Sequence, residues 1–284
     1  MNILITGTSS GFGRKAVETL AGKGHTVVAS MRGVGGKNAE AAKSIESWAK
    51  ENNAKVYVVE LDVADDASVD KGVAQAIEKA GGLDVVVNNA GIANMGVQEA
   101  FSIAQAKQIF DVNTFGPMRV SNAVLPHLRG KKAGLIVNIS SIVSQFPFPF
   151  MGIYCASKAA LEVLSDDYNA TLQGSGVESV LLEPGAYPTE IYGKIMQPDN
   201  AEKVMPGYPN AGPTMEGMSK GFQTLFETAK PDPQDVVDGL VKLIETPAGQ
   251  RPGRTVIDGV SGKIVESHLE ARGKTYGEFL KIYS

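Results

Sequence analysis

The stretch Asn2-Ile3-Leu4-Ile5-Thr6-Gly7-Thr8-Ser9-Ser10-Gly11-Phe12-Gly13 decides the fold of this chain. It passes from an apolar strand through a glycine-rich turn into residues 13–21, whose apolar spacing predicts a helix. Glycine lets a backbone turn sharply and approach a ligand closely, and a helix N-terminus offers unpaired N–H groups and a positive dipole end. This order of elements predicts a pyrophosphate-binding turn, although the glycine spacing departs from the usual dinucleotide-binding pattern. The residues expected at the turn are Gly7, Ser9, Ser10, Gly11, Phe12 and Gly13.

Short apolar runs and longer helical patterns alternate along most of the chain. The runs cover residues 3–5, 26–29, 55–61, 83–88, 134–139 and 178–182, and the helical patterns cover residues 13–21, 37–52, 68–80, 100–128 and 152–173. The runs are rich in Val and Ile and apolar on both faces, as in a parallel sheet that is covered on both sides. We therefore expect an α/β fold, a doubly wound parallel sheet flanked by helices, in a single domain over residues 1–284.

Three details complete the expected fold. The pattern over 100–128 predicts two helices with a break near Gly116-Pro117. A helix over 235–244 and a last strand over 254–257 should follow. The tail over 263–284 mixes apolar and charged residues and should pack either on the domain or on a partner subunit.

The composition is that of an ordinary globular protein and excludes several classes of function. The 284 residues carry a net charge of −4, which provides no electrostatic basis for binding nucleic acid or an anionic membrane. A single cysteine and three scattered histidines exclude a disulfide framework and a zinc-type cluster, so no metal site is expected. No apolar run approaches the roughly 20 residues of a membrane span, and the first strand begins without a basic leader. We therefore expect a cytoplasmic protein.

Residues 191–233 depart from the alternating pattern. They contain prolines at 198, 206, 209, 213, 231 and 233, interleaved with methionines and aromatic residues. The segment is too apolar for a solvated linker and too often interrupted for one long helix. It is either a surface insertion that packs its own small core or a lid over a binding site. We favour the lid, because long ordered insertions in compact domains often have that function.

The residues after the second and third strands bear on the choice of cofactor. An acidic residue after the second strand would accept hydrogen bonds from the ribose of NAD, but this chain has Ser30-Met31-Arg32 there. Arg32 is either a solvated side chain at a strand end or a bidentate partner of a 2′-phosphate. With the glycine turn nearby, we favour NADP over NAD. Asp62 and Val63 follow the third strand where they would meet the adenine, although Asp62 would equally suit a turn or a helix cap.

Tyr154-Cys155-Ala156-Ser157-Lys158 lies in the pattern that predicts a helix over 152–173. Its tyrosine and lysine are four residues apart, so both lie on one face of the helix. A cation beside a phenol favours the phenolate and lowers its pKa, which would bring a general acid and base toward neutral pH. The same spacing also occurs in helices with a packed tyrosine and a solvated lysine. The pair therefore indicates a general acid and base only together with the other motifs.

Those other motifs follow one another in a characteristic order. They are the turn at 6–13, Asn88-Asn89-Ala90-Gly91 after the fourth strand, Asn113 in Asp-Val-Asn-Thr, Ser141 in Asn-Ile-Ser-Ser, the pair Tyr154 and Lys158, and Pro184-Gly185 followed by Thr189. In order and approximate spacing they resemble the short-chain dehydrogenase/reductase family over about residues 1–190. The resemblance implies a Rossmann-like fold and an NADP-preferring oxidoreductase of the Tyr-x-x-x-Lys type.

The resemblance also implies a role for each matching residue. Tyr154 would donate a proton to a carbonyl oxygen in reduction, or act as the base in oxidation. Lys158 would lower the pKa of that phenol and bind the nicotinamide ribose. Ser141 would orient the substrate oxygen; Ser140 is its competitor, but the family places this serine thirteen residues before the tyrosine. Asn113 would hold a water of the proton relay through its backbone. The remaining cofactor contacts implied are Asn89, Ala90, Gly91, Pro184, Gly185 and Thr189.

Two departures from the family's pattern concern the cofactor. Tyr187-Pro188 precedes Thr189, where the family often has a small aliphatic residue that contacts the nicotinamide. Ser10 stands where a basic residue sometimes marks specificity for NADP. The preference for NADP therefore depends mainly on Arg32.

The expected reaction is hydride transfer between NADP(H) and a carbonyl compound or secondary alcohol, in the direction of reduction. The methionines and aromatic residues of 191–233 favour a medium-sized apolar ketone or aldehyde. A carboxylate substrate would instead use Arg119, Lys194 or Lys203. Three alternatives stay open: an NAD-linked alcohol dehydrogenase, an epimerase or isomerase of the same fold, and a non-catalytic dinucleotide-binding sensor. The resemblance also suggests a homo-oligomer, either a dimer or a tetramer.

Overall fold

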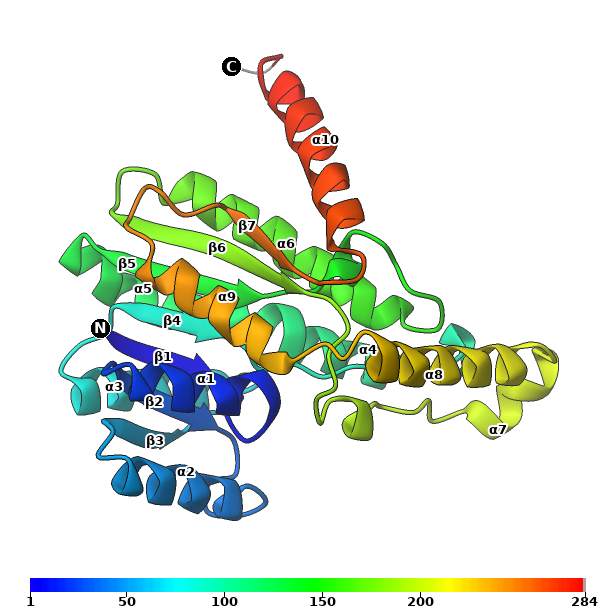
Figure 1. Cartoon of the computed structure of the whole chain (residues 1–284), viewed down its shortest axis with the longest axis horizontal. Helices are drawn as coiled ribbons and strands as arrows, with labels where there is room; N and C mark the ends of the chain where they lie inside the picture. Colours follow the sequence, from blue (N-terminus) through cyan, green and yellow to red (C-terminus); the bar gives the residue numbers. More distant parts are fainter. Residues whose placement is uncertain (283–284) are drawn as a thin grey trace.

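The structure, a computed structural model that describes residues 1–282, is built around one parallel β-sheet (Figure 1). The strands are β1 (Asn2–Thr6), β2 (Thr26–Met31), β3 (Val56–Glu60), β4 (Val85–Asn88), β5 (Gly134–Ile139), β6 (Val177–Pro184) and β7 (Arg254–Ile257). They lie in the order β3-β2-β1-β4-β5-β6-β7, and every neighbouring pair is parallel. The doubly wound α/β fold expected from the alternation of apolar runs and helical patterns is confirmed.

Helices connect the strands and cover both faces of the sheet. They are α1 (Gly11–Gly22), α2 (Ala39–Glu51), α3 (Asp66–Ala80), α4 (Ile103–Phe110), α5 (Gly116–Lys131), α6 (Gly152–Thr171), α7 (Ala201–Val204), α8 (Ala211–Thr228), α9 (Pro233–Glu245) and α10 (Gly262–Leu280). Because successive side chains of a strand point to opposite faces, Ile3 and Ile5 join one buried core and Leu4 joins the other. Helices α1, α2 and α9 pack on the first core, and α3 and α5 pack on the second.

The strand order reverses between β1 and β4. The chain first builds outward from β1 to β2 and β3, and then returns to place β4 on the other side of β1. Connections after β1 and β4 therefore leave the sheet toward opposite faces, which opens a crevice at the carboxyl ends of these strands. The glycine turn lies at this crevice because it follows β1 directly.

The break expected near Gly116-Pro117 lies just before these residues. One π-helical turn, Asp111–Phe115, joins α4 to α5, and Gly116 and Pro117 are the first residues of α5. A proline in the first turn of a helix costs no hydrogen bond, because the N–H group there has no partner within the helix. Single π-helical turns are frequent at functional sites, and this one contains Asn113.

Residues 191–233 form an arm that projects beside the carboxyl ends of the strands (Figure 1). The arm is not one long helix, as its prolines indicated, because two 3₁₀ turns and the short helix α7 precede the 18-residue helix α8. The sequence did not locate α8 itself. Pro213 lies in the first turn of α8 and Pro231 lies beyond its end, so neither removes a bond from the helix interior. The start of the arm is bound to the domain, because Met196 donates its N–H to Ala93 (2.9 Å) and accepts from the N–H of Met95 (3.2 Å).

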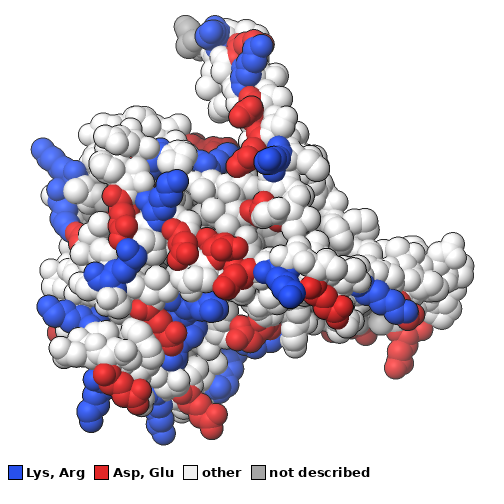
Figure 2. Space-filling model, in the orientation of Figure 1, with Lys and Arg blue, Asp and Glu red and all other residues white. Residues whose placement is uncertain are grey.

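The tail and the surface complete the fold. Helix α10 extends away from the domain (Figure 1), and Val265 in its first turn is buried against the domain. Positions 283–284 of the expected tail lie outside the described residues. None of the helices within 1–282 combines the length and apolarity needed to cross a membrane. On the face shown in Figure 2, basic and acidic side chains are interspersed, as expected for a net charge of −4.

A substitution at Gly7 tests how tightly the glycine turn packs on β4. Gly7 has a φ of +71°, and a Cβ there would lie 2.7 Å from the Cα of Ala90. Gly7→Ala should therefore lower the free energy of unfolding by about 1–3 kcal/mol, measured by urea denaturation. Gly22→Ala is the matched control, because a Cβ at this helix end meets nothing within 4 Å. Equal stability of the two variants would contradict the close approach.

Candidate active site

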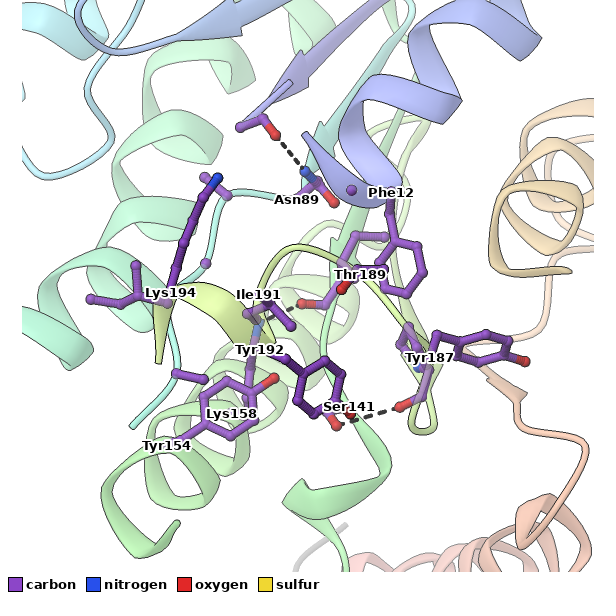
Figure 3. Close-up of a pocket in the computed structure, with 18 of the residues that line it drawn as sticks. Phe12, Asn89, Ser141, Tyr154, Lys158, Tyr187, Thr189, Ile191, Tyr192 and Lys194 are labelled. Atoms are coloured by element: carbon purple, nitrogen blue, oxygen red, sulfur yellow. Dashed lines mark hydrogen bonds between the residues drawn. The ribbon is translucent and has the colours of Figure 1, made fainter. Parts of the chain in front are cut away.

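A cavity of about 660 Å³ opens at the crevice where the strand order reverses (Figure 3). It is lined by segments that follow β1 to β6 and by the arm, and its size suits a dinucleotide together with a small substrate. Of the cations considered for a carboxylate substrate, Lys194 lines it, whereas Arg119 and Lys203 do not. Every catalytic or cofactor-binding residue expected from the sequence lines it except Gly13 and Asn113. Those two lie behind its wall, against Asn89 and Gly91 respectively.

Hydrogen bonds hold the glycine turn against the segment that follows β4. The Thr6 hydroxyl accepts from the backbone N–H groups of Asn89 (3.0 Å) and Ala90 (3.1 Å). In return, the Asn89 side-chain amide donates to the carbonyls of Thr6 (2.9 Å) and Gly7 (3.1 Å). A Cβ at Gly13 would lie 2.5 Å from that amide nitrogen, so only glycine fits there. The turn is thus a rigid cradle whose backbone borders the cavity.

The N-terminus of α1 is open toward the cavity. Ser10 is the N-cap residue, but its hydroxyl caps no backbone N–H, and the first turn contains no acidic side chain. The Ser10 hydroxyl is instead within 3.1 Å of the ammonium group of Lys194, which reaches the turn from the arm (Figure 3). The helix dipole and this lysine together present positive charge to an anion bound at the turn. Sequence reasoning missed this role of Lys194, because the two residues lie 184 positions apart.

Arg32 lies at the far end of the cavity, after β2. Its guanidinium is 3.9 Å from the Asp62 carboxylate, and the Arg32 side chain is 43% exposed, so it is accessible to a ligand. Asp62 also accepts from the N–H of Ala64 (3.1 Å), which confirms the turn role that its sequence position allowed. Lys37 and Asn38 line the same end, and sequence reasoning missed both because they lie in the loop that precedes α2.

Tyr154 and Lys158 lie one turn apart on α6 and both border the cavity (Figure 3). The N-terminal part of α6 is positioned by Asn94, whose side-chain oxygen accepts from the N–H of Tyr154 at 2.8 Å. The Lys158 side chain is buried, donates to the carbonyl of Ile139 (2.7 Å), and places its nitrogen 5.9 Å from the centroid of the Tyr154 ring.

Burial shifts the pKa values of this pair in opposite directions. It raises the pKa of the Tyr154 phenol, and a hydrogen bond with Ser141 opposes that shift. It lowers the pKa of Lys158 to about 8, and the charge of Glu162 opposes that shift. The sequence predicted that Lys158 lowers the pKa of the Tyr154 phenol, whereas in the structure burial raises it. The phenol is therefore protonated at neutral pH, which is the form that donates a proton.

Ser141 follows β5 and faces the same space as Tyr154 (Figure 3). Besides its hydrogen bond with Tyr154, its hydroxyl makes two long hydrogen bonds, to the carbonyl of Pro184 and from the N–H of Val143, both at 3.4 Å. The neighbouring Ser140 donates its hydroxyl to Glu162 at 2.7 Å. Because Ser140 is engaged elsewhere, Ser141 is the serine whose hydroxyl is available to a substrate oxygen.

Asn113 connects α6 to the segment after β4. Its side chain accepts from the N–H of Ile92 (2.9 Å) and donates to the Ile92 carbonyl (2.8 Å) and the Ser157 hydroxyl (3.0 Å). It is completely buried, so its side chain serves to hold α6 and the segment after β4 together. The π-helical turn around it sets its backbone apart from the regular hydrogen bonding of α4 and α5.

The segment after β6 closes the cavity near Ser141. Pro184, Gly185 and Thr189 line it, as the family resemblance implied. The unusual Tyr187 turns into the hydrophobic core, where it is 4% exposed and packs edge-on against Phe12 with 6.0 Å between ring centroids. The core therefore accommodates this departure from the family's pattern without blocking the cavity.

The arm supplies an apolar wall to the cavity. The sequence predicted that residues 191–233 cover a site, but it did not show which of their side chains form the wall. Phe222 of α8 contacts Phe148 (5.3 Å between ring centroids) and Tyr192 (5.8 Å). Other apolar residues of this end are Met95, Ile142, Val143, Met151, Ile191, Ile195, Leu225 and Val260. Burial raises the pKa of Tyr192 to about 12, and its hydroxyl has no hydrogen-bond partner among the residues described.

Comparisons with known proteins agree with this geometry. Residues 1–200 match the model of the short chain dehydrogenase family. Retinol dehydrogenase 8 of Homo sapiens is 34% identical over 253 residues, 86% of this chain and 78% of that protein. The 3-ketodihydrosphingosine reductase of Bacteroides thetaiotaomicron is 34% identical over 187 residues, 66% of this chain and 64% of that one. The crystal structure of a short-chain dehydrogenase from Streptomyces avermitilis is 28% identical, with a TM-score of 0.75, over 99% of this chain and 98% of that one. The chain therefore belongs to the short-chain dehydrogenase/reductase family of oxidoreductases, whose fold binds a nicotinamide dinucleotide.

Proposed function

We propose that this protein reduces a medium-sized apolar ketone or aldehyde with NADPH. The observation that carries the proposal is that Ser141, Tyr154 and Lys158 border the same cavity as the glycine turn. A dinucleotide seated on that turn would extend along the cavity toward these three side chains. The raised pKa of Tyr154 supports the direction of reduction, because a protonated phenol is required as the donor.

The proposed mechanism assigns one task to each side chain. The nicotinamide, when bound, supplies the hydride. The Ser141 and Tyr154 hydroxyls donate hydrogen bonds to the substrate oxygen, where negative charge develops, and Tyr154 then transfers its proton to that oxygen. Lys158 holds positive charge near the phenol and binds the ribose. Asn113 keeps α6 and the segment after β4 in register.

NADP is favoured over NAD by the charges at the far end of the cavity. Arg32 and Lys37 both line it there, and a 2′-phosphate would lie between such groups. The pairing of Arg32 with Asp62 spans 3.9 Å between exposed groups, so it is weak and leaves the guanidinium available. Lys194 would meet the pyrophosphate, since it already contacts the glycine turn.

The substrate class is inferred from the wall that the arm contributes. The arm residues bordering the cavity are Ile191, Tyr192, Lys194, Ile195, Phe222 and Leu225. Lys194 is directed to the glycine turn, so the rest of this wall is apolar or aromatic and favours an apolar molecule. The names of two relatives, a retinol dehydrogenase and a 3-ketodihydrosphingosine reductase, agree with this inference. We therefore propose that the arm is a substrate lid within a single catalytic domain.

Replacement of the proposed acid tests the reaction against a non-catalytic sensor. Tyr154→Phe should bind NADPH normally but reduce carbonyl compounds about 10²–10⁴-fold more slowly, because it lacks the proton donor. Tyr168→Phe is the matched control, since that phenol lies on the same helix but bonds Asn122. Steady-state NADPH oxidation measures both. Undiminished turnover by Tyr154→Phe would refute the assignment.

Replacement of Arg32 tests the choice of cofactor. Arg32→Ala should weaken NADPH binding about 10–100-fold through the loss of charge-assisted hydrogen bonds, and leave NADH binding within about twofold. Fluorescence titration of each reduced cofactor gives the affinities. Arg14→Ala is the control, because Arg14 pairs with Glu18 on α1 outside the cavity. An equal loss for both cofactors would show that Arg32 does not contact the 2′-phosphate.

A panel of carbonyl compounds tests the substrate class. We expect kcat/KM to rise from short anionic oxo acids to decanal, aryl alkyl ketones and steroid-like ketones, because larger apolar molecules bury more surface against the arm. NADPH oxidation is followed for each compound, with NADH in parallel. Preference for the short anionic substrates would contradict the apolar assignment.

A further inference from the structure

Four hydrogen-bond donors converge on one buried carboxylate outside the cavity. Glu162 lies on α6 and is 2% exposed. It accepts from the Ser140 hydroxyl at 2.7 Å and from the Arg254 guanidinium at 2.5 Å. The Ser144 hydroxyl and the Gln145 amide also bond it. A carboxylate held by this many donors at such low exposure has one fixed orientation.

The donors are placed on both sides of Ser141. Ser140 precedes it, and Ser144 and Gln145 follow within one short helical turn. The two hydrogen bonds that join the Ser141 hydroxyl to the backbone are both 3.4 Å long, so they restrain it weakly. The position of the serine therefore depends on its neighbours, and these are tied to α6 through Glu162.

Glu162 also lies on the helix face that carries the acid. Tyr154, Lys158 and Glu162 follow one another at intervals of four residues. The carboxylate of Glu162 is the charged group that opposes the effect of burial on the Lys158 ammonium. A buried ammonium group without such a counter-charge tends to lose its proton.

Other charged groups around Glu162 do not cancel its charge. Arg254 of β7 contacts Glu162, Glu183 of β6 (2.9 Å) and Asp166 of α6 (2.6 Å). Arg272 of α10 pairs with Asp166, at 3.5 Å. Burial and the charge of Glu162 raise the pKa of Glu183. One guanidinium shared among three carboxylates leaves negative charge from Glu162 to act on Lys158.

We propose that Glu162 is a positioning residue of this site, which clamps the segment carrying Ser141 and supplies the counter-charge of Lys158. The proposal rests on the proposed reductase function only for its kinetic tests. Glu162 does not line the cavity, so it acts through Ser141 and Lys158 without touching substrate or cofactor.

Glu162→Gln tests both parts of the proposal. Each oxygen of the Glu162 carboxylate accepts from two donors, and an amide nitrogen cannot accept, so the clamp loosens in either orientation of the amide and kcat should fall at least about tenfold. The dissociation constant of NADPH should stay within about threefold of the wild-type value, because Glu162 lies outside the cavity. Loss of the negative charge makes proton loss from Tyr154 or Lys158 easier. The alkaline limit of reductase activity should therefore move about one pH unit lower.

Two variants separate positioning from a general effect on stability. Glu183→Gln neutralises a carboxylate of the same cluster that does not act on Lys158, so the alkaline limit should stay in place. Glu162→Asp keeps the charge but is one methylene shorter, so the alkaline limit should return toward the wild-type pH while kcat stays low. Equal movement of the limit in Glu162→Gln and Glu183→Gln would overturn the counter-charge role.

Amide hydrogen exchange tests the clamp without a substrate. Exchange over residues 140–150 should be faster in Glu162→Gln than in the wild type, with residues 6–13 unchanged. If Glu162→Gln does not fold, Ser144→Ala and Gln145→Ala remove single bonds of the clamp and should each speed the same exchange. Unchanged exchange and unchanged kcat would overturn the proposal. A wild-type protein that reduces no carbonyl of the panel would instead refute the reductase function, and the exchange result would still decide the clamp.

Discussion

One face of α6 carries Tyr154, Lys158 and Glu162 at intervals of four residues, and the burial of two charges on this face constrains the rest of the site. A buried ammonium group is stable only with a counter-charge, and a buried carboxylate only with donors. The donors to Glu162 come from the segment after β5 and from β7. The hydrogen bonds that the buried Glu162 requires therefore align Tyr154 on α6 with Ser141 after β5.

The sheet provides the second constraint. The reversal of strand order between β1 and β4 places the glycine turn and the segment 89–91 side by side, where Thr6 and Asn89 bond them together. Neither contact involves the residues proposed for the chemistry. The proposed phosphate-binding turn and the proposed acid thus reach one cavity through independent sets of hydrogen bonds. The first set joins the segments that follow β1 and β4, and the second lies along α6.

The features that could be predicted from the sequence are those with a local period or a local order. The runs of β1 to β6, the glycine turn and the shared face of Tyr154 and Lys158 depend on neighbours a few residues away, so their pattern is visible in the chain. The contacts of Lys194 with Ser10 and of Glu162 with Arg254 join residues 184 and 92 positions apart. Nothing local marks them, because each side chain alone would suit a solvated surface. Helix α8 was not predicted for another reason. Its prolines lie in its first turn or outside it, where they do not interrupt a helix, and a count of prolines does not take their position into account.

The arm links the two halves of the cavity physically. Its Tyr192 and Phe222 belong to the apolar end, while its Lys194 contacts the glycine turn, so one segment touches both the end proposed for the cofactor and the end proposed for the substrate. Backbone hydrogen bonds of Met196 with Ala93 and Met95 hold the start of the arm against the segment after β4. A dinucleotide that engages Lys194 would therefore act on the same backbone that positions Tyr192 two residues earlier. In the proposed function, cofactor binding would be coupled to the shape of the apolar wall through this short distance along the chain.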